Sequence, residues 1–135
     1  MSVSGAALSQ APVGAAALTG AVVTVADLGL HLIGGSFGIA AMSGSLAAGA
    51  AVFLVVAAAG ALLRGKSTRA ARWARNYPWR FAVLPAVAAA VIALVLTTVT
   101  GGGFFHGILS GIEHGGIVYA VTGAAGVVSK SRKRP

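Results

Sequence analysis

The chain of 135 residues is 57% hydrophobic and only 9% charged, with a mean hydropathy of +0.90. About a quarter of the residues of a soluble domain are charged, so this composition excludes a soluble globular fold and indicates one membrane domain, residues 1–135. The net charge of +8 comes from ten lysines and arginines against two acids, and the lack of cysteine excludes disulfides and thiolate chemistry.

The N-terminal part of the chain predicts a first membrane-spanning helix over about residues 11–34. Residues 1–10 contain no basic residue, and no convincing cleavage site follows, so we expect the N-terminus to be retained rather than removed as a signal peptide. The stretch that follows is rich in Ala, Val, Gly and Thr. Glycines at 34, 35 and 38 then favour a turn, because glycine is unfavourable in helices and common in turns.

A second spanning helix is predicted over residues 38–63, which contain no charged residue. Small residues recur in its first half at a spacing of four, as Ala40, Gly44 and Ala48. Such a face lets another helix approach closely in lipid, so we expect it to pack against a helix.

Residues 64–80 form a basic segment that we expect to be a cytoplasmic loop. Basic residues concentrate in short cytoplasmic loops, and the interleaved Trp73, Tyr77 and Trp79 are typical of the headgroup layer. Its basic residues are Arg64, Lys66, Arg69, Arg72, Arg75 and Arg80.

Two further spanning helices are predicted over residues 81–100 and 104–128, separated by three consecutive glycines. The last helix contains Gly107, Gly111 and Gly115 in the pattern GxxxGxxxG, which favours close helix packing within the molecule or between copies. The tail, 129–135, contains the remaining basic residues Lys130, Arg132, Lys133 and Arg134.

These elements predict an all-α bundle of four transmembrane helices with both termini in the cytoplasm, since that topology puts both basic segments inside. An alternative has three spans, with residues 1–35 outside or along the interface. Heavy use of Ala, Gly, Val and Arg suggests a high-GC bacterium, and therefore a bacterial cytoplasmic membrane.

The two acids and three histidines are expected near the outer ends of the first and fourth helices. Ionisable groups inside a bilayer are costly, so they are candidates for a proton relay or an ion path. They can equally lie in the headgroup layer or form hydrogen bonds between helices. No HExxH or similar run is present, and we expect neither a metal site nor a cofactor. These residues are Asp27, His31, His106, Glu113 and His114.

The basic segment and the tail have three alternative binding partners. Contact with anionic headgroups is favoured, because each basic side chain near the surface contributes about 1 kcal/mol. Nucleic acid is the second, since arginines contact phosphates and aromatic rings stack on bases. An acidic cytoplasmic protein is the third.

No phosphate-binding glycine loop, GxSxG or cysteine nucleophile is present, so we expect no enzyme. The segment AARWARNYPWR and the tail SKSRKRP resemble, in layout over residues 38–135, the small hydrophobic spread and transfer proteins of conjugative plasmids in high-GC bacteria. The resemblance implies a homo-oligomeric component of an apparatus that transfers DNA or protein. Two alternatives stay open: a phage holin, and a small ion or proton channel or transporter that uses Asp27, Glu113 and the histidines.

Overall fold

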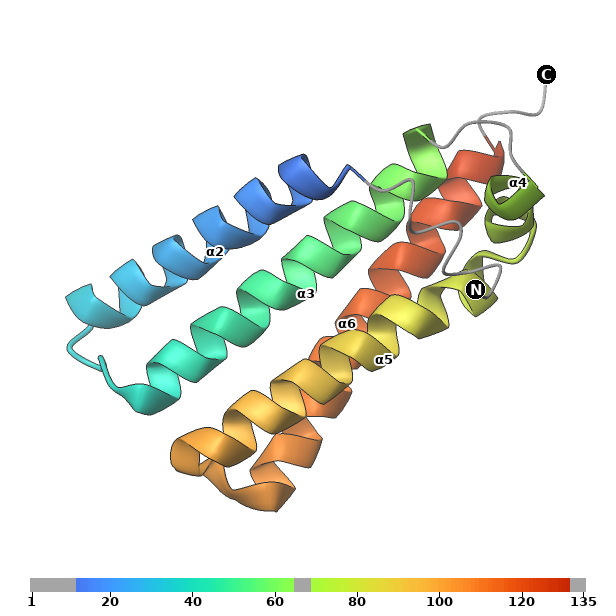
Figure 1. Cartoon of the computed structure of the whole chain (residues 1–135). Helices are drawn as coiled ribbons and strands as arrows, with labels where there is room; N and C mark the ends of the chain where they lie inside the picture. Colours follow the sequence, from blue (N-terminus) through green and yellow to red (C-terminus); the bar gives the residue numbers. More distant parts are fainter. Residues whose placement is uncertain (1–11, 65–68, 132–135) are drawn as a thin grey trace.

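The computed structural model describes residues 12–64 and 69–131, and they are almost entirely helical (Figure 1). No strand occurs in these two ranges, so the prediction of an all-α fold is confirmed for them. The helices are α2 (Val13–Ile33), α3 (Ile39–Arg64), α4 (Arg69–Asn76), α5 (Pro78–Thr97) and α6 (Gly103–Ser131), with a π-helical turn η1 (Thr98–Gly102) between α5 and α6.

Three helical segments of the described chain are long and apolar enough to cross a membrane: Val13–Ile33, Ile39–Leu63 and Pro78–Ser131. The third contains 54 residues because it is a hairpin of α5 and α6 joined through η1. Gly101 and Gly103 adopt φ angles of +91° and +76° in this turn. Side chains other than glycine rarely adopt such angles, so the glycines make the reversal possible.

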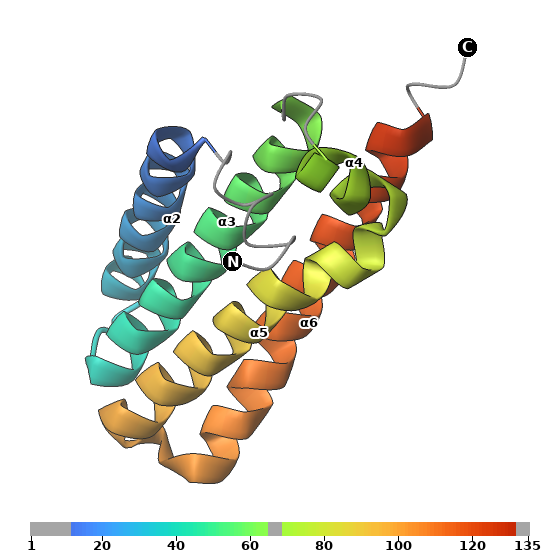
Figure 2. The same cartoon turned by 45° about the vertical axis from the view of Figure 1, so that its right-hand side comes forward.

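The bundle is built on the contact between the antiparallel helices α5 and α6, and α3 packs against both. α2 makes its main contacts with α3 and lies at the edge of the bundle (Figures 1 and 2). The side chains at these contacts are small, and Ala51, Ala86, Ala89 and Val118 form one buried cluster between α3, α5 and α6. Small residues let helix backbones approach closely, which is how helices gain packing energy in lipid.

The short helix α4 packs across the ends of α3, α5 and α6 (Figure 2). Ala74 of α4 is buried in a cluster with Leu62 of α3 and Phe81 of α5. Ala71, three residues before Ala74, is buried as well, so the helix presents a small apolar face to the bundle.

The segment 64–80, expected to be a loop, therefore differs in structure from the prediction. α3 continues to Arg64, α4 occupies Arg69–Asn76, and α5 begins at Pro78 rather than at residue 81. Proline suits the first position of a helix because the N–H that it lacks would have no partner there. The other helices lie close to the expected spans, although α6 extends to Ser131, past the predicted end at 128.

Candidate functional site

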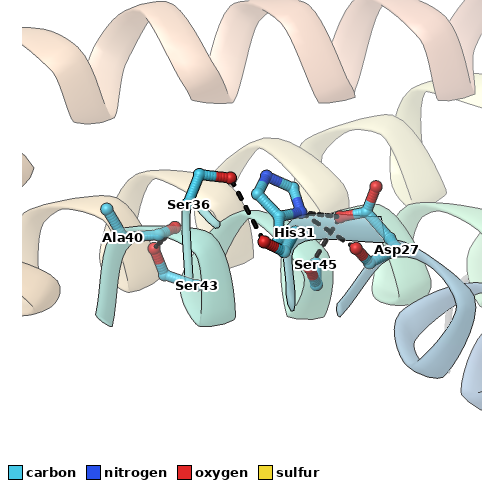
Figure 3. A network of polar contacts seen from close by, with 6 residues as sticks. All are labelled: Asp27, His31, Ser36, Ala40, Ser43 and Ser45. Atoms are coloured by element: carbon cyan, nitrogen blue, oxygen red, sulfur yellow. Dashed lines mark hydrogen bonds and ion pairs between the residues drawn. The ribbon is translucent and has the colours of Figure 1, made fainter. Parts of the chain in front are cut away.

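A polar contact joins the C-terminal half of α2 to α3 (Figure 3). The Ser45 hydroxyl of α3 is fully buried and donates a hydrogen bond of 2.6 Å to Oδ2 of Asp27 in α2. Nδ1 of His31, one helical turn after Asp27, lies 2.9 Å from the Asp27 carbonyl oxygen and 3.5 Å from its Oδ2. A carbonyl oxygen can only accept, so Nδ1 carries the proton and also points toward the carboxylate. Asp27 is thus held by partners on two helices.

A close approach of α2 and α3 lies on the same side of the bundle. A Cβ added at Gly49 would meet the side chain of Thr24 and lie 2.7 Å from the Gly20 carbonyl oxygen. A Cβ at Gly20 would likewise lie 2.7 Å from the Gly49 carbonyl oxygen. Sequence patterns do not single out these two glycines, because no other glycine lies three or four residues from either of them and only the partner helix reveals the pairing.

A cavity of about 310 Å³ with several polar groups in its wall opens between the first turns of α3, the turn η1 and the first half of α6. His106, Ser110 and Glu113 of α6 line it together. It is also lined by Ser43 and Gly44 of α3. Sequence reasoning missed the hydroxyls that complete this wall, Ser43, Thr97 and Thr100, because they come from three separate elements.

His114 does not line this cavity. Its Nδ1 lies 2.9 Å from the Ser110 carbonyl oxygen one turn earlier, and must donate to it. Within residues 12–64 and 69–131 no three His, Cys, Asp or Glu side chains come close enough to hold a metal ion. Four of the five ionisable groups therefore separate into two places, Asp27 with His31 at the α2–α3 contact and His106 with Glu113 at the cavity, while His114 belongs to neither.

The two small-residue faces have different surroundings. Gly107, Gly111 and Gly115 are buried against α5, where a Cβ at Gly111 would lie 2.8 Å from the Ala90 carbonyl oxygen. In contrast, Gly44 has open space where a Cβ would stand. Ala40 is exposed and Ala48 is half-buried, so this face is not packed tightly against another helix of the same chain.

α4 and the C-terminal end of α6, which contain basic residues, lie at the end of the bundle opposite η1 (Figure 1). Arg69 and Arg72 of α4 are exposed, and the guanidinium carbon of Arg80 lies 5.5 Å from the ring centre of Tyr77. Lys130, near the C-terminal end of α6, is exposed as well. Arg75 is half-buried; Lys66, Arg132, Lys133, Arg134 and the side chain of Arg64 lie outside the described parts.

Aromatic rings accompany these charges. The Trp73 and Tyr77 ring centres are 6.1 Å apart, and those of Trp79 and Tyr119 are 5.4 Å apart. Trp and Tyr prefer the headgroup layer, where one side of the ring is apolar and the other is wet. This end of the bundle therefore has the chemistry of a membrane–water interface that attracts anions.

Comparison with known proteins adds no family to this picture. Neither a family model, nor a curated protein, nor a solved structure matches the chain. The arguments for function therefore come from the geometry described above.

Proposed function

We propose that the chain is a non-enzymatic, self-associating membrane subunit of a bacterial apparatus that transfers DNA across the cytoplasmic membrane. The observation that carries the proposal is the basic end of the bundle, where α4 presents Arg69 and Arg72 outward. Closely spaced arginines on a short, packed helix match the phosphates of a nucleic acid, and the neighbouring rings of Trp73 and Tyr77 can stack on bases.

In this proposal α2, α3, α5 and α6 each cross the membrane, and α4 lies on its cytoplasmic surface. α5 has 20 residues and α6 has 29, and about 20 residues suffice for a crossing. The antiparallel course of α5 and α6 returns the C-terminal end of α6 to the side of α4, in keeping with the positive-inside rule.

Support for self-association comes from α2. Only Ala16 and Gly20 of this helix are buried, and Leu18, Val22 and Val25 are exposed. The glycine face of α6 already contacts α5 and is not free for a second copy, whereas α2 has the smallest buried share of the three membrane-spanning candidates and so offers an apolar face for contact between copies.

Self-association is tested by the mass of the protein in nanodiscs, together with cysteine cross-linking, which the cysteine-free chain makes unambiguous. We expect a defined multimer, and we expect Val22→Cys to form disulfide-linked dimers on oxidation. Val91→Cys on α5 is the matched control, since Val22 and Val91 are 58% and 54% exposed. A monomer that does not cross-link at Val22 would refute this part of the proposal.

DNA binding is tested by retention of duplex DNA on nanodiscs of zwitterionic lipid at several salt concentrations. Replacing Arg69, Arg72 and Arg75 with Gln should flatten the slope of log K against log salt by about 2.7, because each phosphate that an arginine neutralises adds about 0.9 to that slope. Replacing the same residues with Lys keeps the charge and should preserve most of the binding. Equal slopes for the wild type and the Gln variant would exclude DNA as the ligand of α4.

A further inference from the structure

We propose that the cavity between α3, η1 and α6 binds an alkali-metal cation, with the Glu113 carboxylate as its charge partner. The cavity lies at the end of the bundle opposite α4 (Figure 1). The inference therefore does not depend on what α4 binds.

Two of the four hydroxyls in the wall, those of Thr100 and Ser43, present lone pairs rather than protons to the cavity. The Thr100 hydroxyl donates to the Leu96 carbonyl oxygen at 2.7 Å, and the Ser43 hydroxyl donates to the Ala40 carbonyl oxygen at 2.9 Å. A hydroxyl has one proton and two lone pairs, so once its proton is used within its own helix it can only accept. Together with the Glu113 carboxylate, these groups form a wall of acceptors, which suits a cation.

The charged groups around the cavity also favour a cation as its ligand. No Lys or Arg lines it. Among the described residues Glu113 has no ion-pair or hydrogen-bond partner, whereas Asp27 has Ser45 and His31. The positive N-terminal ends of α3 and α6 lie at the cavity, but their effect fades within one turn, and Glu113 is ten residues into α6. At the depth of Glu113 in the cavity, the electrostatic potential is therefore set mainly by the Glu113 carboxylate.

The depth of Glu113 makes a partner necessary. Ten residues of α6 correspond to about 15 Å, which is half of a hydrocarbon layer of about 30 Å if the α5–α6 turn lies at the membrane surface. An unpaired carboxylate at that depth is costly, and a cation with part of its hydration shell would neutralise it.

The ligand set favours a monovalent cation over a divalent one. Ca²⁺ and Mg²⁺ sites usually contain more than one carboxylate, and only Glu113 supplies one here. Hydroxyl oxygens and one carboxylate suit a weakly held alkali ion, and about 310 Å³ gives room for such an ion with several water molecules.

The test measures thermal unfolding of the nanodisc-embedded protein by tryptophan fluorescence in NaCl, KCl, LiCl and N-methylglucamine chloride at equal ionic strength. At least one alkali cation should raise Tm saturably above the N-methylglucamine value, by mass action on the folded state. Glu113→Gln, which keeps the size of the side chain, should lose this rise. Asp27→Asn is the matched control and should keep it, since Asp27 does not line the cavity.

A second variant keeps the proposal testable if Glu113→Gln does not fold. Ser110→Ala removes one oxygen from the wall and should raise the cation concentration at half-maximal effect about fivefold, the usual effect of removing one hydrogen bond. Identical Tm values in all four salts for the wild type would overturn the proposal. So would a cation-dependent rise that Glu113→Gln and Ser110→Ala both retain in full.

Discussion

The contact between α5 and α6 can be tested with two neighbouring glycines of α6. A Cβ added at Gly115 would lie 2.9 Å from the Ala90 Cβ and 3.0 Å from the Ala86 carbonyl oxygen. A Cβ added at Gly116 would have nothing within 4 Å. Gly115→Ala and Gly116→Ala therefore introduce the same methyl group into the same helix, one against α5 and one into open space.

The expected difference follows from two opposing terms. Replacing glycine by alanine inside a helix favours the helix by about 1 kcal/mol at both positions, because alanine has less conformational freedom to lose. At Gly115 the methyl group also meets a backbone carbonyl that cannot rotate away, and overpacking of this kind costs about 1–3 kcal/mol. Gly116→Ala should therefore raise the free energy of unfolding, and Gly115→Ala should have a lower value than Gly116→Ala by about 1–3 kcal/mol.

The fluorescence of Trp79 is a suitable signal, since this residue of α5 lies where a Cβ at Gly123 of α6 would stand, and its ring contacts the ring of Tyr119 at a tilt of 44°. Unfolding would be followed in mixed micelles with increasing denaturing detergent, in a background where Trp73, the second tryptophan, is replaced by Phe. Equal stability of the two alanine variants, or a less stable Gly116→Ala, would refute the assignment of Gly115 to the α5 contact.

Two further predictions concern the α2–α3 contact and the course of the chain through the membrane. Ser45→Ala removes the donor to Asp27 and should lower the free energy of unfolding by about 1 kcal/mol. Ser43→Ala should lower it less, because the Ser43 hydroxyl donates within its own helix; detergent titration measures both variants. In the cysteine-free chain, Asn76→Cys should react with an impermeant maleimide only from the cytoplasmic side and Phe105→Cys only from the opposite side; labelling of both from one side would contradict a membrane-spanning α5.

The positions of the long helices could be predicted from the sequence because charge and glycine mark their ends. No charged residue interrupts 38–63, and the glycines at 101–103 coincide with the reversal between α5 and α6. The helix α4 could not be predicted in this way. It has eight residues, too few for a stable isolated helix, and its apolar face consists of alanines that are buried only because Leu62 and Phe81 are there.

The small-residue patterns show a second limit of sequence reasoning. Gly107, Gly111 and Gly115 have the same spacing as Ala40, Gly44 and Ala48, yet only the first set is buried in a close contact with another helix. The spacing makes close approach possible but does not choose the partner. α5 offers alanines opposite the α6 glycines, while α3 meets α2 through Gly49, which belongs to neither pattern.

The two acids illustrate why the structure changes the choice of functional residue. In the sequence Asp27 and Glu113 are equivalent, since each has a histidine nearby on its own helix and an apolar surrounding. In the structure Asp27 receives a hydrogen bond from Ser45, eighteen positions away on another helix, and so has a structural partner. Glu113 lines a cavity in which the hydroxyls of Ser43 and Thr100 have already donated their protons within their own helical segments. Because a carboxylate in a membrane needs a partner, and the described chain supplies one only to Asp27, Glu113 is the acid that is free to bind a ligand.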